Sequence, residues 1–100
     1  MASDEPRIQV RVTGMSSLRS VIRKGTPISM NHGNTVKDLI GQLEEEFGSI
    51  YKRQTNEDLT DVLSKLFTLT INGKLASPRL KLSQVLKDGD EIVFFQWTGA

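Results

Sequence analysis

Apolar and polar residues alternate along two well-separated segments of this chain. In Arg7–Thr13 every second residue is apolar, and Phe67–Ile71 shows the same alternation. Because successive side chains of a strand point to opposite faces of a sheet, this pattern is typical of a half-buried β-strand. Ile28–Met30 predicts a short strand of the same kind. Glu91–Gln96 instead contains four consecutive apolar residues, which predicts a strand in the middle of the sheet.

Between these strands the apolar residues repeat with a helical period. The main amphipathic helix is predicted over Thr35–Phe47, with a buried side formed by Val36, Leu39, Ile40, Leu43 and Phe47. The hydroxyl of Thr35 can accept a hydrogen bond from the backbone N–H of Asp38, which would cap the first turn. Gly48 is expected to end this helix in the left-handed conformation that glycine adopts easily.

A second, shorter helix is predicted over Asn56–Leu66, with a buried stripe formed by Leu59, Val62, Leu63 and Leu66. Ser49–Thr55 would connect the two helices, and Lys81–Leu86 suits a short helical turn. This order predicts an α+β fold, a mixed sheet of about four strands with one main helix across one face. The predicted core comprises Ile8, Val10, Leu39, Leu43, Leu69, Ile71, Ile92 and Phe94.

Composition narrows the chemistry that this domain can perform. Its 100 residues include no cysteine, which excludes disulfides, thiolate metal sites and cysteine nucleophiles. With one histidine, His32, a zinc or iron site lacks ligands, and we expect neither a metal nor a cofactor. Thirteen Lys and Arg residues balance twelve Asp and Glu residues without a basic block, which argues against a nucleic-acid partner.

The apolar runs and the first residues predict where the protein acts. The longest apolar run, Ile92–Phe95, is far too short to span a membrane. Met1–Pro6 is polar and acidic, unlike a secretory signal, and residues 1–6 are expected to form a disordered N-terminal tail. The expected location is therefore cytoplasmic, with no membrane partner.

Few polar residues qualify as catalytic groups, and each has a simpler interpretation. His32 lies among turn residues with no carboxylate predicted beside it, so we interpret it as a solvated turn residue. Glu44–Glu46 fit a solvated helix face, with an acidic docking patch as the alternative. Asp88 and Asp90 are typical of a tight turn around Gly89. No catalytic residue is assigned, and an enzyme is not expected.

Trp97 follows the last predicted strand, so it either covers the core or contacts a partner, since tryptophan is enriched at binding hot spots. Ile92–Phe95 supplies apolar side chains to both sheet faces, whereas one main helix covers only one face. We therefore expect an apolar patch on the face away from that helix, reaching the C-terminus through Phe95 and Trp97. The second helix is the alternative cover for this face.

Five segments taken together resemble the small subunit of molybdopterin synthase. These are Asp88–Phe95 (Asp-Gly-Asp-Glu-Ile-Val-Phe-Phe), the opening strand Ile8–Val12, the pair Leu18-Arg19, the helix start Thr35–Leu39 and the strand end Leu69–Gly73. This family and the thiamine sulfur carrier form the MoaD/ThiS group of ubiquitin-like proteins. The resemblance implies a ubiquitin-like β-grasp domain over residues 7–96 and a flexible C-terminal tail at residues 97–100.

The resemblance also implies a function that resides in this tail. In the family an E1-like enzyme adenylates the terminal carboxylate, and sulfur transfer then gives a thiocarboxylate. The molybdopterin synthase large subunit uses that sulfur for molybdenum cofactor biosynthesis. By resemblance, Ala100 is the activated residue, Gly99 is its slim neighbour, and Phe95, Trp97 and Thr98 contact the two partner enzymes. The protein itself would be a carrier.

The tail departs from the family at the residues that carry this chemistry. Typical members end in Pro-Pro-x-x-Gly-Gly, whereas this chain ends in Gln96-Trp97-Thr98-Gly99-Ala100. The methyl group of Ala100 would crowd a channel shaped for glycine, although the carboxylate chemistry itself needs no glycine. Two hypotheses follow: a divergent sulfur carrier, or a non-catalytic β-grasp adaptor that has lost the Gly-Gly carrier tail.

Overall fold

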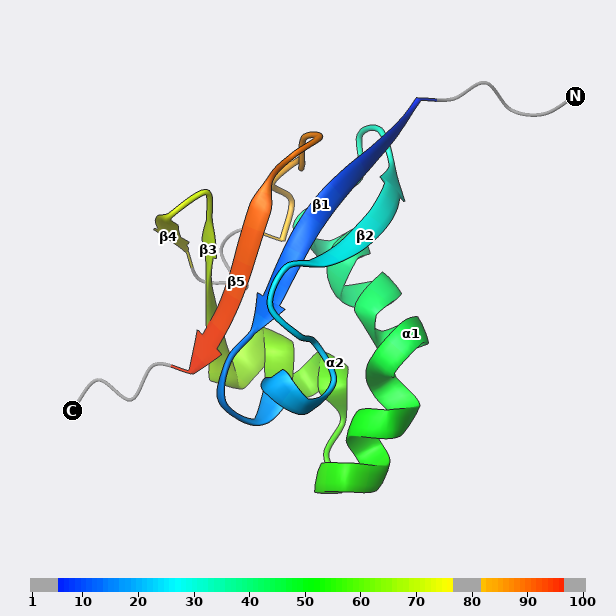
Figure 1. The fold of residues 1–100 in the computed structure, drawn as a ribbon, viewed down its shortest axis with the longest axis vertical. Coiled ribbons are helices and arrows are strands. Elements are labelled where there is room, and N and C mark those ends of the chain that lie inside the picture. Colours follow the sequence, from blue (N-terminus) through cyan, green and yellow to red (C-terminus); the bar gives the residue numbers. More distant parts are fainter. Residues whose placement is uncertain (1–5, 77–81, 97–100) are drawn as a thin grey trace, which may run out of the picture.

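The structure, a computed structural model, describes residues 6–76 and 82–96. The elements follow the chain in the order β1 (Arg7–Gly14), η1 (Ser16–Ser20), β2 (Thr26–Asn31), α1 (Val36–Thr55), α2 (Leu59–Asp61), η2 (Val62–Leu66), β3 (Phe67–Ile71), β4 (Lys74–Ala76) and β5 (Glu91–Gln96). The strands form one mixed sheet in the order β2-β1-β5-β3-β4. Figure 1 shows α1 crossing one face of this sheet, which confirms the predicted α+β fold.

The sheet contains five strands, one more than the sequence predicted. The additional strand, β4, follows a tight turn in which Asn72 (φ 53°) and Gly73 (φ 84°) adopt left-handed conformations. β4 pairs antiparallel with β3 over three residues, too few for alternation to be recognised. β5 lies in the middle of the sheet, parallel to β1 and antiparallel to β3, as its run of apolar residues predicted.

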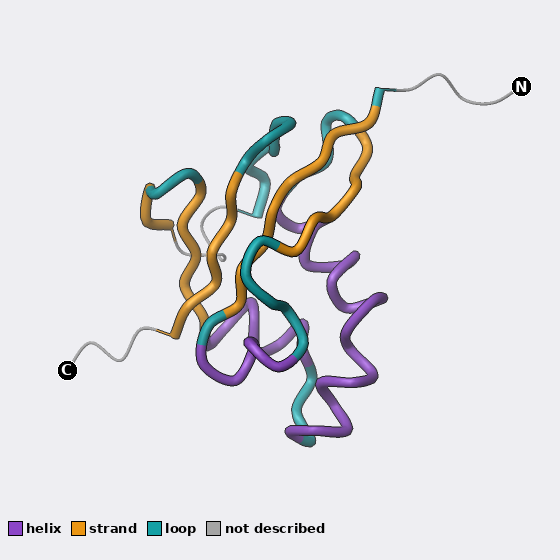
Figure 2. The backbone as a smooth tube through the Cα atoms, in the orientation of Figure 1, coloured by secondary structure: helices purple, strands orange, loops and turns teal. Residues whose placement is uncertain are grey.

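The core lies between the sheet and α1. Seven of the eight predicted core residues are buried: Ile8, Val10, Leu39, Leu43, Leu69, Ile92 and Phe94. The eighth, Ile71, is half-buried and packs against this core. Leu59, Val62 and Leu63 of α2 and η2 belong to the same buried cluster, so these turns pack on the α1 side of the sheet. Figure 2 shows the helical segments gathered beside and below the layer of strands.

The predicted cap of α1 is confirmed, and it forms a complete capping box. The hydroxyl of Thr35 accepts from the Asp38 N–H at 3.4 Å, and the Asp38 carboxylate accepts from the Thr35 N–H at 2.8 Å. The predicted end of this helix at Gly48 is wrong, because α1 continues to Thr55 and is capped by Asn56, whose φ is 62°. Residues 49–55 are therefore helical and not a connection.

Tertiary packing explains why α1 continues past Gly48. Tyr51 is fully buried, and its hydroxyl lies 3.2 Å from the hydroxyl of Ser17 in η1. Burial of a tyrosine side chain outweighs the cost of about 1 kcal/mol that a glycine imposes inside a helix. The missing side chain at Gly48 also leaves room for Glu44, which a Cβ at that position would meet.

Two further predictions about helices need correction. The second helix begins at Leu59 and not at Asn56, because the carboxylate of Asp58 caps it by accepting from the Thr60 N–H at 2.9 Å. Lys81 lies outside the described residues, and residues 82–86 are not helical. This segment instead supplies hydrogen-bond acceptors for the first N–H groups of α1. Val36 donates its N–H to the carbonyl of Gln84, and Lys37 donates its N–H to the carbonyl of Leu82, both at 3.0 Å.

Candidate functional site

The end of β5 is the point from which the predicted tail leaves the sheet. Gln96, the last residue of β5, pairs with Phe67 of β3. The predicted site residues Trp97, Thr98, Gly99 and Ala100 all lie outside the described residues. Phe95, the remaining predicted partner contact, is half-buried on the sheet face opposite α1. The candidate site is therefore built from β5 and from the residues that surround its end.

The start of β5 is held by the turn Asp88-Gly89-Asp90. The carboxylate of Asp90 accepts from the side-chain amide of Asn72 and from the N–H of Lys87, both at 2.8 Å. Its backbone carbonyl accepts from the Arg11 N–H at 3.0 Å. Asp90 is only 9% exposed, so these contacts lie in a largely dry environment. We call these contacts the Asp90 clamp; it joins β5 to β1 and to the β3–β4 turn.

Asp88 completes this turn from the other side. Its carboxylate accepts from the Gln9 N–H at 2.8 Å, and the Gln9 carbonyl accepts from the Gly89 N–H at 2.8 Å. Gly89 has φ of 86°, which favours glycine at this position. Both aspartates therefore hold strands together, as expected of turn-forming residues.

The sheet face away from α1, which we call the open face, carries mixed side chains. Its central residues are Thr13 of β1, Thr68 and Thr70 of β3, and Val93 and Phe95 of β5, all half-buried. Leu75 of β4 lies opposite Thr70 on this face and is 62% exposed. The expected apolar patch is thus present only in part, because threonines separate its apolar members.

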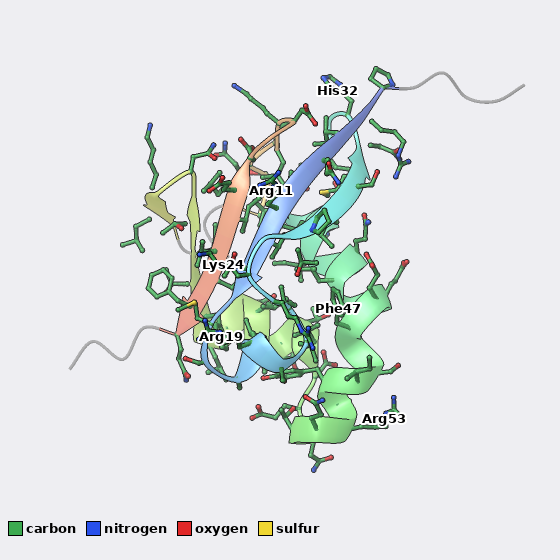
Figure 3. The ribbon with its side chains drawn as sticks, viewed as in Figure 1. Arg11, Arg19, Lys24, His32, Phe47 and Arg53 are labelled. Carbon is green, nitrogen blue, oxygen red and sulfur yellow. The ribbon has the colours of Figure 1, made fainter. Side chains whose placement is uncertain are left out.

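The open face also carries charged side chains. Arg11 of β1, Lys24 and Val93 line a shallow hollow of about 150 Å³ together with Glu91. Figure 3 shows Arg11 and Lys24 along the sheet and Arg19 on η1, close to the end of β5 in that view. Within the described residues, an ion pair is found between Lys65 and Asp61, at 3.8 Å and largely exposed. Arg11, Arg19 and Lys24 take no part in that pair, and Glu91 is the carboxylate that lines the hollow beside Arg11 and Lys24.

The other polar candidates have structural or solvated roles. His32 is exposed in the turn after β2, and its N–H donates to the Pro6 carbonyl at 3.0 Å. Figure 3 places it at the end of the molecule opposite the end of β5. Glu44 is not solvated as predicted, because its carboxylate accepts from the Thr60 N–H (3.0 Å) and hydroxyl (2.9 Å) and so joins α1 to α2. Glu45 and Glu46 are exposed, as predicted.

The described residues contain neither a cluster of metal ligands nor a membrane-spanning helix. Within residues 6–76 and 82–96, no three His, Asp or Glu residues lie close enough together to hold a metal ion. In the same part of the chain, every helix is too short or too polar to cross a membrane.

Two exposed apolar residues, Met15 and Leu66, lie beside the end of β5, and the sequence did not predict either as a site residue. Met15 follows β1, is 38% exposed, and donates its N–H to the Phe94 carbonyl at 3.0 Å. Leu66 ends η2 directly before β3 and is 53% exposed, although the helical stripe predicted it to be buried. Both residues lie near the end of β5 because of how β5 pairs with β1 and with β3. The alternation of apolar residues within one segment does not show which strands pair.

Comparisons with known proteins identify a matching family and similar folds. The model of the ThiS family matches residues 16–99. SAMP1 from Haloferax volcanii has 17% identity and a TM-score of 0.63, over 92% of this chain and 98% of that one. The HVO 2177 protein of the same organism has 20% identity and a TM-score of 0.66, over 100% and 93%.

A third structure belongs to the small archaeal modifier protein 1 (SAMP1) from Methanosarcina acetivorans. It shares 20% identity and a TM-score of 0.62, over 95% of this chain and 98% of that one. At these identities the likeness concerns the fold alone, and it confirms the ubiquitin-like β-grasp arrangement. No curated protein sequence gives a significant match.

Proposed function

Because this chain belongs to the ThiS family of ubiquitin-like sulfur carriers and modifiers, we propose that it carries sulfur on its C-terminal carboxylate. An E1-like enzyme would join the Ala100 carboxylate to AMP from ATP and release pyrophosphate. A sulfur donor would then displace AMP and leave a thiocarboxylate. The observation that carries the proposal is the family match, which runs from η1 through β5 and reaches Gly99 in the tail.

The arrangement of β5 supports a carrier role. β5 is hydrogen-bonded to β1 on one side and to β3 on the other, and its pairing with β3 continues to Gln96. The Asp90 clamp holds its start. A tail that follows such a strand starts from a fixed point, which limits the orientations that a partner must sample during docking. The chemistry itself would be performed by the partner enzymes.

The residues near the end of the chain divide into a reactive end and docking contacts. Ala100 supplies the carboxylate, and Gly99 keeps the chain slim beside it. Phe95, Trp97 and Thr98 would contact the partner enzyme, with Trp97 as the main apolar anchor. Replacement of Trp97 by alanine should then weaken binding by about 2 kcal/mol, with little effect on thermal stability.

The more specific form of the proposal concerns the acceptor of the sulfur. Asp88–Phe95 and Leu18-Arg19 resemble the small subunit of molybdopterin synthase, so the synthase large subunit is the proposed acceptor. The sulfur would serve molybdenum cofactor biosynthesis in the cytoplasm. Binding of the purified large subunit, followed by conversion of the pterin precursor only when thiocarboxylated protein is supplied, would support this assignment.

The test of the carrier function is the intact mass of the protein after incubation with its E1-like enzyme, ATP and a sulfur donor. Wild-type protein should gain the mass of one oxygen-to-sulfur exchange, and omission of ATP is the matched control. Ala100→Gly should react at least as fast, because the alanine methyl group can only crowd a narrow channel. Deletion of Gly99 and Ala100 should abolish the reaction.

Three results would contradict the carrier function. A wild-type mass that stays constant while Ala100→Gly gains sulfur would indicate a docking-competent adaptor. Binding to the enzyme without any mass change in either form would point to an adaptor whose tail is unsuited to activation. Absence of binding to an E1-like enzyme would leave only the likeness of fold.

A further inference from the structure

Met15 and Leu66 lie on opposite sides of the point where β5 ends. Met15 is bonded to β5 through its N–H and the Phe94 carbonyl, at 3.0 Å. Leu66 directly precedes Phe67, whose register partner is Gln96. Met15 therefore lies beside the last residues of β5, and Leu66 lies one residue before the register partner of Gln96. We call Met15 and Leu66 the apolar rim.

The fold itself does not require large apolar side chains at these two positions. In η2 the residues that anchor the turn are Val62 and Leu63, which are buried, whereas Leu66 is 53% exposed. Met15 contributes its backbone to the sheet while its side chain is 38% exposed. Single exposed apolar residues are common. Met15 and Leu66 differ from such isolated residues because they flank the same strand end.

The reach of the tail gives these two residues a role, which rests on the proposed function. Four residues, 97–100, separate β5 from the carboxylate that would be activated. In full extension they span at most about 14 Å. A reaction centre that lies inside a partner can be reached only if the partner surface closes on the end of β5. A partner that closes on the end of β5 can contact Met15 on one side of this strand end and Leu66 on the other.

We propose that the apolar rim is the docking contact for the E1-like enzyme at the mouth of its tail channel. The rim would bury its two side chains against apolar residues of the enzyme. This contact aligns the tail with the channel before the carboxylate reaches ATP. The rim differs from Phe95 and Trp97 because it comes from β1 and η2, so it contributes to binding even when the tail is absent.

The test compares Met15→Gln and Leu66→Gln with a matched control, Ile50→Gln. Ile50 lies on α1 and is 40% exposed, so its replacement makes a similar chemical change on the other layer of the molecule. Affinity for the E1-like enzyme is measured by calorimetry, in full-length protein and in protein that lacks residues 97–100. Each rim variant should bind about tenfold more weakly in both backgrounds. Ile50→Gln should change affinity by less than about twofold.

The outcomes separate the rim from the carrier function. Unchanged affinity of both rim variants, while wild type gains sulfur, would overturn the rim and leave the carrier function intact. Weaker binding of the rim variants in a protein that never gains sulfur would support the rim and contradict the carrier function. Self-association that the rim variants abolish would assign these residues to a second copy of the chain and overturn the proposal, as would absence of any binding. Unchanged thermal unfolding of the variants confirms that they are folded.

Discussion

The Asp90 clamp gives the sharpest prediction about how β5 is held. Asp90→Ala removes a carboxylate that accepts from the Asn72 amide and the Lys87 N–H, both at 2.8 Å. Hydrogen bonds to a charged group contribute about 1.5–3 kcal/mol each, and the two are not fully additive. Because Asp90 is 9% exposed, water can replace them only in part. We expect the free energy of unfolding to fall by about 2–4 kcal/mol.

Asp90→Asn refines this estimate. The asparagine keeps one acceptor oxygen but presents an NH₂ group to the second donor, so about half of the loss, roughly 1–2 kcal/mol, should remain. Glu91→Gln is the matched control, because Glu91 is exposed and the same turn holds its backbone. It should change the free energy of unfolding by less than about 0.5 kcal/mol.

The assay is urea unfolding followed by circular dichroism, with thermal unfolding as a second measurement. A loss of 1 kcal/mol should lower Tm by about 4–8 °C in a domain of this size. The double variant Asp90→Ala with Asn72→Ala should show a coupling energy of about 1 kcal/mol, since the two side chains share a hydrogen bond. If Asp90→Ala costs less than about 0.5 kcal/mol, the backbone alone holds the turn and the reasoning about the clamp is wrong.

Two further predictions concern the core and the close contact between Gly14 and η1. Leu43→Ala should lower the free energy of unfolding by about 2–5 kcal/mol, because Leu43 is fully buried between α1 and the sheet; a cost below about 1 kcal/mol in urea unfolding would remove it from the core. Gly14→Ala should lower it by about 1–3 kcal/mol, because a Cβ there would lie 2.7 Å from the Leu18 Cβ; unchanged stability would show that η1 can shift away without cost.

Local patterns in the sequence were sufficient for the elements whose stability is local. Alternation located β1, β2 and β3, since the side-chain period of a strand depends only on its own backbone, and the run of four apolar residues located β5. The capping box of α1 was visible because Thr35 and Asp38 are three residues apart. The order of these elements, with the Asp-Gly-Asp-Glu turn, also identified the family that the match over residues 16–99 confirms.

Some candidate site residues could be recognised from local sequence patterns, and others could not. Phe95 was assigned to the face opposite the main helix because alternation within β5 determines it, and the structure places it there. Met15 and Leu66 were not recognised, because their position beside β5 depends on which strands pair and in which register. That register follows from packing between segments that are far apart in the chain.

Tertiary structure alone decided where the helices end and how the remaining polar groups are satisfied. α1 continues past Gly48 because Tyr51 finds a buried position against η1, more than thirty residues away in the chain. Residues 82–86 are not helical, and the carbonyls of Gln84 and Leu82 accept hydrogen bonds from the first N–H groups of α1. A sequence pattern encodes the period and the caps of an element. The donors and acceptors that an element leaves unpaired are satisfied by whichever distant segment the fold brings beside it, and that choice exists only in three dimensions.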